Sequence, residues 1–181
     1  MGLTVVQYDS MRRMGWRPLR DPGGAWPSGL ALGPHGWAMD LGFALSGALL
    51  LLFALGLDRA LGRGSKAGPA LLSVAGTAMT LLSLETDPIR RTGPRSWHGL
   101  VHDIAFVVFA LALVLALLFL WLRMRKDPRW HRHARFTLAT AVACAACLVL
   151  PGVAYYGFLL TALAWIEATA IKLLAADRPA G

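Results

Sequence analysis

Long apolar runs separated by short polar stretches are the main pattern of this chain. The runs cover residues 34–57, 69–85, 97–123, 128–150 and 153–173. Within each run nonpolar residues follow one another, instead of alternating as in a strand or keeping to one face of a helix. A helix needs ~20 such residues to cross a bilayer. The pattern therefore predicts an all-α, polytopic membrane helix bundle with about five transmembrane helices.

Local signals place the ends of these helices. Gly33-Pro34 and Gly68-Pro69 are typical of helix starts, because proline suits the first helical position. Ser96 is a candidate N-cap for the third helix, and Asp127-Pro128 predicts the start of the fourth. Pro151-Gly152 predicts a tight turn between the last two helices. The alternative is one helix bent at Pro151, but its roughly 45 residues would far exceed the length of a membrane span.

The remaining residues predict a segment before the bundle and a tail after it. Residues 1–33 hold too many charges to span a membrane, yet Tyr8, Trp16 and Trp26 make them aromatic. We interpret them as an N-terminal interfacial segment whose aromatic rings lie near lipid headgroups. The bundle then occupies residues 34–176, and residues 177–181 form a C-terminal tail.

Small side chains on the first two runs predict close packing between those helices. Gly42 and Ser46 lie on the first run, and Ser73 and Gly76 lie on the second. Small residues let two helix backbones approach each other in a membrane. The same faces could instead dock another helix, so they also predict a homo- or hetero-oligomer.

Composition supports a membrane location and argues against nucleic acid. Hydrophobic residues make up 56% of the 181 residues and charged residues only 15%, against about a quarter charged in soluble domains. The formal net charge is +8, but the Lys and Arg lie mainly between the apolar runs and form no basic stripe interleaved with aromatics. Membrane lipid is therefore the expected partner. Cys144 and Cys147 lie inside an apolar run, where cysteine is usually a packing residue.

The distribution of basic residues predicts the orientation. Five spans place 11 of the 18 Lys and Arg on one side of the membrane. By the positive-inside rule that side is cytoplasmic. The C-terminus is then cytoplasmic, and residues 1–33 and the connector 86–97 lie outside.

A polar stretch between the second and third runs carries the candidate chemistry. This topology brings the outer ends of the first three helices together, and with them the side chains His35, Asp40, Glu85, Asp87, His98, His102 and Asp103. His98 and His102 are four residues apart and so share a helix face. With Asp87 as the third ligand they would form a zinc site with a free position for water, and Glu85 or Asp40 could replace Asp87. Such a metal would polarise a carbonyl or activate water.

Metal-free and structural interpretations of the same residues stay open. The histidines could act as general bases, with Asp103 and Asp40 in support. Alternatively, His98 is an interfacial residue beside Trp97, and Asp103 pairs with an arginine of the connector. Ionisable residues at membrane depth are costly, and this favours a functional site.

These interpretations lead to three functional hypotheses. The first is a membrane enzyme, a metal-assisted hydrolase or an acid–base catalyst, that acts on an apolar small molecule of lipid-like or isoprenoid-like type. The second is a non-enzymatic accessory or ligand-binding subunit in which the polar cluster is structural. The third is proton or ion movement through Glu167 with Asp40 and Asp103.

Two sequence elements resemble a known family. They are Pro27-Ser-Gly-Leu-Ala-Leu-Gly-Pro-His-Gly-Trp37 and Glu85-Thr-Asp-Pro88 followed by Trp97-His-Gly-Leu-Val-His-Asp103. Together they resemble the bacterial multi-pass membrane family catalogued as domain of unknown function 998. The resemblance implies a bacterial cytoplasmic membrane location and a His/Asp motif, but no established reaction. Family members usually carry a further helix before residues 28–34, so we expect this chain to lack the family's first transmembrane helix.

Overall fold

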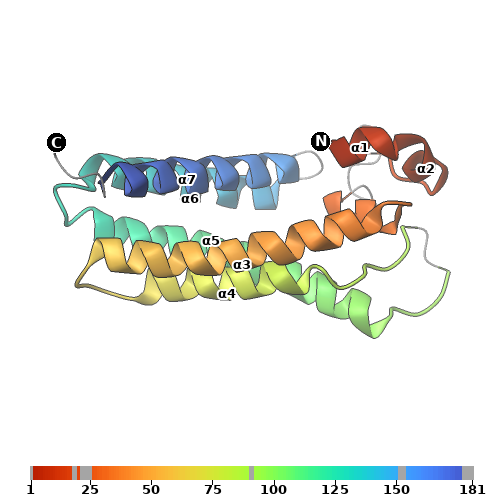
Figure 1. The fold of residues 1–181 in the computed structure, drawn as a ribbon, viewed down its shortest axis with the longest axis horizontal. Coiled ribbons are helices and arrows are strands. Elements are labelled where there is room, and N and C mark those ends of the chain that lie inside the picture. The colour runs from red at the N-terminus through yellow and green to blue at the C-terminus, as the bar shows by residue number, and fades with distance from the viewer. Residues whose placement is uncertain (1, 18–19, 21–25, 90–91, 151–153, 177–181) are drawn as a thin grey trace. The chain divides into compact units, whose positions relative to one another are not determined.

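The computed structural model describes residues 2–17, 20, 26–89, 92–150 and 154–176, and every regular element in this part of the chain is helical. The elements are α1 (Gly2–Val6), α2 (Tyr8–Arg13), the 3-10 helix η1 (Pro27–Leu32), α3 (Gly36–Leu61), α4 (Ala67–Leu81), α5 (Trp97–Met124), α6 (His131–Val149) and α7 (Ala154–Ala176) (Figure 1). The all-α prediction is confirmed.

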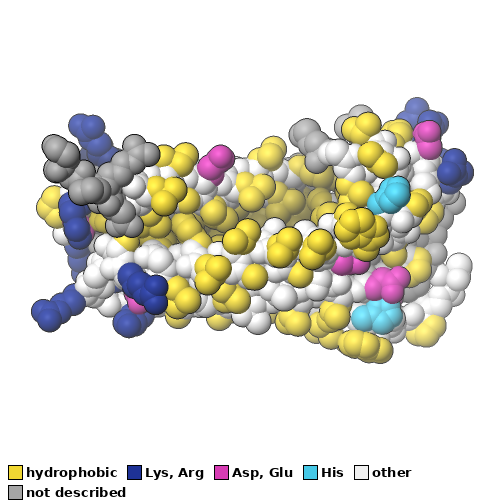
Figure 2. All heavy atoms as spheres, viewed as in Figure 1, with side chains coloured by type: hydrophobic (Ala, Val, Ile, Leu, Met, Phe, Trp, Pro, Cys, Tyr) yellow, Lys and Arg dark blue, Asp and Glu magenta, His cyan; other side chains and the backbone are white. Residues whose placement is uncertain are grey.

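Three of the described helices, α3, α5 and α7, are long and apolar enough to cross a membrane, and α4 is apolar but shorter. These helices carry exposed leucines, such as Leu49 at 64%, Leu111 at 58% and Leu163 at 60%. Figure 2 shows many hydrophobic side chains on the viewed surface of the molecule. Apolar exposure on this scale requires lipid or a partner in place of water. The chain is therefore an integral membrane protein with about four candidate spans, and a fifth span stays a prediction.

The chain divides into two compact units. The first unit comprises Met1–Leu49 and Ala75–Phe109, and the second comprises Leu50–Val74 and Ala110–Gly181. Each unit contains part of α3, α4 and α5. The second unit also contains α6 and α7, which pack against each other.

The boundaries of α3 and α4 differ by a few residues from those predicted. α3 begins at Gly36, because Gly33 and Pro34 belong to a turn in which the Gly36 N–H donates to the Gly33 carbonyl. α4 ends at Leu81 because the N–H groups of residues 82–84 bond to carbonyls three residues back. This tighter 3-10 pattern closes the helix early.

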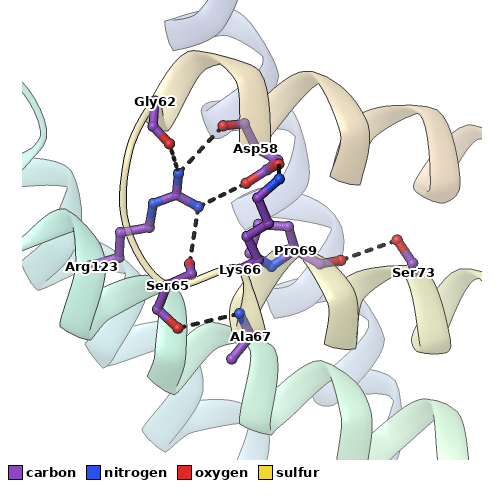
Figure 3. Close-up of polar contacts among 8 residues, drawn as sticks. All are labelled: Asp58, Gly62, Ser65, Lys66, Ala67, Pro69, Ser73 and Arg123. Carbon is purple, nitrogen blue, oxygen red and sulfur yellow. Dashed lines mark hydrogen bonds and ion pairs between the residues drawn. The ribbon is translucent and has the colours of Figure 1, made fainter.

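α3 also continues to Leu61, four residues beyond the predicted end at residue 57, and Arg123 of α5 binds its last turn (Figure 3). The Arg123 guanidinium donates to the Asp58 carboxylate over 2.9 Å and to the Ser65 carbonyl over 3.1 Å. It also donates to the Gly62 carbonyl. The Arg123 side chain is only 6% exposed. One cation thus neutralises the end of α3 and satisfies carbonyls that no helix bond reaches.

α6 begins at His131 and not at residue 128. Asp127 Oδ1 accepts the Arg129 N–H over 2.9 Å, and the two side chains form an ion pair of 2.8 Å. Hydrogen bonds from Arg129 lower the pKa of the Asp127 carboxyl. Trp130 N–H donates to the Asp127 carbonyl, so Asp127-Pro128 opens a turn before the helix.

α6 and α7 are separate helices, so the single bent helix is wrong. α6 ends at Val149, and Leu150 is extended, as expected for a residue that precedes proline. The tight turn predicted at Pro151-Gly152 lies outside the described residues.

Glycines bring α3 and α4 into close contact within the first unit, although not the residues that we predicted on α3. A Cβ on Gly47 would lie 2.6 Å from the Gly76 carbonyl oxygen, whereas a Cβ on Gly42 would meet nothing within 4 Å. Ser46 is exposed. The contact face of α3 is thus one residue out of phase with the predicted Gly42/Ser46 face, while Gly76 on α4 is at the contact.

We expect Gly47→Ala to destabilise the protein and Gly42→Ala to be tolerated. The added methyl at residue 47 would force α3 away from α4, and overpacking of this kind costs about 1–3 kcal/mol. At residue 42 the same methyl meets open space and improves helix propensity. Thermal unfolding in detergent would compare the two variants. Equal melting temperatures would contradict the assignment of Gly47 to the contact.

The N-terminal elements form a small core of their own. Met11, Trp16 and Leu30 are buried and pack with Met39 and Ile89. Trp16 was expected beside lipid headgroups, but it is only 3% exposed. Its indole N–H donates to the Trp26 carbonyl over 3.0 Å, so the ring packs against protein. Tyr8 and Trp26 are 43% and 42% exposed, and their placement at headgroups stays a prediction.

Candidate functional site

Helix α5 places His98 and His102 one turn apart, and both rings bind the connector that follows α4 in the first unit. His102 Nδ1 lies 2.9 Å from the Leu84 carbonyl oxygen, and His98 Nδ1 lies 2.9 Å from that of Glu85. A carbonyl oxygen can only accept, so Nδ1 carries the proton in both rings. In the neutral rings Nε2 then holds the lone pair.

The early end of α4 explains why these carbonyls are available. α4 ends at Leu81 and a 3-10 turn follows to Leu84, so the carbonyls of Leu84 and Glu85 lie beyond the reach of helix hydrogen bonds. The two histidines supply the missing donors from the first turns of α5. Their spacing is therefore matched to two successive carbonyls of the connector.

Ser96 joins the connector to the start of α5. Its hydroxyl accepts the Gly99 N–H over 2.9 Å, which confirms the predicted N-cap, and donates to Asp87 Oδ1 over 2.6 Å. The hydroxyl oxygen of Ser96 also lies 3.0 Å from His98 Nδ1. A Cβ on Gly99 would lie 2.6 Å from Asp87 Oδ2, so the glycine makes room for the carboxylate. One hydroxyl thus links Asp87, His98 and the helix start.

We expect Ser96→Ala to lower the free energy of unfolding by about 1–2 kcal/mol, since it removes the N-cap and the hydroxyl that Asp87 binds. Ser96→Thr keeps the hydroxyl and should retain most of that stability. Denaturant unfolding of the two variants in detergent would measure the difference. An alanine variant as stable as the threonine variant would argue against this linking role.

Asp40 of α3 approaches the same histidines from another helix. It lies within electrostatic range of Glu85 and His102. The Phe43 ring stands edge-on to the His102 ring, with centroids 6.2 Å apart. His102 is only 4% exposed. Asp40 Oδ1 is buried and lacks a hydrogen-bond partner among the described residues, so a buried acceptor of the first unit remains unsatisfied.

Asp103 has a different partner. Its carboxylate forms a 3.0 Å ion pair with Arg95 of the connector, and the two side chains are 49% and 53% exposed. This is the arginine pairing that the structural interpretation of Asp103 anticipated. Exposed pairs contribute at most about 1 kcal/mol. The pair ties the connector to α5 at the surface.

A zinc site is not preformed among these side chains. In the described part of the chain, no three His, Cys, Asp or Glu side chains are grouped so that they could hold a metal ion. Asp87, the predicted third ligand beside His98 and His102, instead binds Ser96. Zinc ligation by these three residues stays a prediction.

Gln7 has a structural role that was not predicted from the sequence. It is 3% exposed, and its amide donates to the Leu30 carbonyl over 2.7 Å and accepts the His35 N–H over 3.1 Å. A Cβ on Gly33 would collide with this amide, so Gly33 is needed for the fit. His35 is exposed and is held here through its backbone. A single glutamine in a polar segment carries no sequence signal for such a role.

The other singled-out residues lie in the second unit. Cys144 is buried and its thiol points to the Phe158 carbonyl at 3.9 Å, which agrees with a packing role. Glu167 is exposed on α7. Near it on α7, Thr169 bonds to the His133 ring of α6 over 2.8 Å. Glu167 thus lies outside the polar site of the first unit.

Comparison with known proteins identifies a family but no reaction for it. The family model described as "Protein of unknown function (DUF998)" matches residues 2–177. No curated protein and no solved structure matches the chain.

Proposed function

Because the chain belongs to the DUF998 family of proteins of unknown function, its relatives supply no reaction, and we propose a function from the geometry of the first unit. The site of Asp40, His98 and His102 binds the polar head of a lipid-like or isoprenoid-like molecule and performs acid–base chemistry on it. The protein would then be a membrane enzyme. The observation that carries this proposal is the buried Asp40 oxygen without a partner.

An unsatisfied buried oxygen is costly for a protein to keep. Leaving such a group without a hydrogen bond costs about 1–3 kcal/mol, and native proteins keep few of them. A ligand hydroxyl or amine would satisfy Asp40 by donating to Oδ1. Functional sites commonly retain features that reduce stability in this way.

The histidines supply the base. Nδ1–H of His102 is held by the Leu84 carbonyl, which fixes the ring orientation and leaves Nε2 as the atom that can take a proton from the ligand. His98 has the same tautomer and is more exposed, so it can accept a hydrogen bond from the ligand head. Asp87 positions His98 through Ser96, and Asp103 positions the connector through Arg95.

Aromatic side chains of the same unit suit a ligand with an apolar tail. Phe43 packs against His102, and the Trp26 and Phe106 rings lie 5.7 Å apart. Trp26 remains 42% exposed, as a ring at a lipid boundary would be. These surroundings support a lipid-like molecule over a small, fully polar substrate.

A second candidate function is a non-enzymatic membrane subunit in which the polar cluster is a lock. It is favoured by the number of groups already engaged in structural bonds. Both histidines bind carbonyls, Asp87 binds Ser96 and Asp103 binds Arg95. Asp40 is the group that this alternative leaves unexplained.

Lipids bound to the purified protein distinguish the two functions. We expect mass spectrometry to find a lipid class enriched with the natural chain and at least tenfold reduced in His102→Gln. His131→Gln removes an exposed histidine at the start of α6 and serves as the control. Incubation of the natural chain with the enriched lipid should convert it, and His102→Gln should not. Equal lipid content in all three proteins, with no conversion, would favour the structural lock.

A further inference from the structure

The second unit contains a cavity of about 420 Å³ beside the loop between α3 and α4 and the end of α5. Basic side chains line it at Arg63, Arg123 and Lys126, and apolar side chains line it at Phe119 and Leu122. One carboxylate, Asp127, lines it as well. The cavity thus combines three cations and one carboxylate with an apolar wall at the end of a membrane-spanning helix.

One hydrogen-bond donor in this cavity is unused. Arg123 is 6% exposed, and its two terminal nitrogens bond to α3 and to the following loop (Figure 3). Its Nε is buried and has no partner in the part of the chain that the structure describes. A buried N–H without an acceptor is as costly as a buried carbonyl without a donor, so this atom is suited to an acceptor from outside the chain.

A glycine lies beside that donor. Gly64 lines the cavity and has φ +148°, and a Cβ there would lie 3.1 Å from Arg123 Nε. A side chain at residue 64 would therefore crowd the atom that lacks a partner. Because residue 64 is glycine, no side chain at this position hinders the approach of a bound group to that nitrogen.

The charge around the cavity favours an anion. Arg63 and Lys126 are exposed. The carboxylates nearby are already neutralised, Asp127 by Arg129 and Asp58 by Arg123 and Lys66. From the free Nε–H, the basic lining and the apolar wall, we infer that this cavity binds a phosphate group. Arg123 Nε–H donates to a phosphate oxygen, and Arg63 and Lys126 flank it.

Two sources of phosphate fit this chemistry. An anionic phospholipid would lay its headgroup against the basic side chains and its acyl chain along Phe119 and Leu122. Basic pockets between membrane helices bind lipid headgroups in this manner. A free phosphate would use the polar wall alone.

The test removes two flanking charges and leaves Arg123 in place, so that the structural bonds to α3 are kept. Arg63→Gln/Lys126→Gln is compared with Arg59→Gln/Arg125→Gln, which removes the same charge from exposed residues outside the cavity lining. Each full-length protein, in a neutral detergent, is titrated with short-chain phosphatidylglycerol, with short-chain phosphatidylcholine and with inorganic phosphate. Intrinsic tryptophan fluorescence and thermal shift report binding.

We expect phosphatidylglycerol to bind the natural chain and the control variant alike, and the cavity variant at least tenfold more weakly. Protection by inorganic phosphate that is lost in the same variant would also support the site and would identify free phosphate as a ligand. Equal weakening in both double variants would overturn the inference, because bulk charge would then explain binding. If neither phosphatidylglycerol nor inorganic phosphate binds the natural chain, the inference is overturned as well. The same holds if the natural chain binds phosphatidylcholine as tightly as phosphatidylglycerol, because the basic side chains then select no anion.

Discussion

Replacing Arg123 by alanine is expected to lower the free energy of unfolding by about 3 kcal/mol or more, the cost typical of breaking a buried ion pair. The variant would leave Asp58 without its main partner and the carbonyls of Gly62 and Ser65 without a donor. Arg125→Ala is the control, because Arg125 is exposed and stacks on Trp121. Unfolding of both variants in detergent, followed by circular dichroism, measures the difference.

A double variant tests whether the loss comes from the pair. Asp58→Ala added to Arg123→Ala should restore part of the stability, since it removes the uncompensated carboxylate. If Arg123→Ala proves no more harmful than Arg125→Ala, the interpretation of Arg123 as the bond between α5 and the end of α3 is wrong.

The second large effect is a pair of opposite changes in stability, which we expect when His102 and Asp40 of the first unit are replaced by alanine. We expect His102→Ala to destabilise the protein by about 1–3 kcal/mol, because the partly buried Leu84 carbonyl loses its donor. Asp40→Ala should raise stability by about 1–2 kcal/mol, because it removes a buried acceptor that has no partner. Chemical denaturation of delipidated protein would measure both changes.

The signs of these two changes separate the proposed functions. If Asp40 were a member of a structural lock, both alanine variants would lose stability. If Asp40 is kept for a ligand, it lowers the stability of the unliganded protein. In that case only the His102→Ala variant loses stability. Ser46→Ala provides a control, because it removes a polar group from an exposed position of α3 and should have little effect on the stability of the first unit.

Much of the architecture was predictable because the runs are uniformly apolar. Uniform runs indicate spans without specifying which face of each helix packs, and this explains the one-residue error that favoured Ser46 over Gly47. The spacing of His98 and His102 and the cap at Ser96 are local properties of α5, so they followed from the sequence. Asp127 was misread because its side chain can start a turn as well as a helix.

The partners of the polar residues were less predictable. Both histidines bind backbone carbonyls, and the sequence does not reveal where a helix leaves its carbonyls free. Trp16 carries the aromatic signal of a membrane interface, yet it fills a small core built by α2 and η1. Arg123 was counted for topology alone, since its contact with Asp58 joins residues far apart in the chain.

The most direct test of the central claim, that Asp40 is kept for a ligand, is thermal unfolding of Asp40→Ala and of the natural chain. Both proteins would be measured after delipidation and again after addition of the lipid that co-purifies with the natural chain. We expect the delipidated variant to melt at a higher temperature than the natural chain, and the lipid to raise the melting temperature of the natural chain alone. A variant that melts lower when delipidated, or that gains as much from the lipid, would contradict the claim.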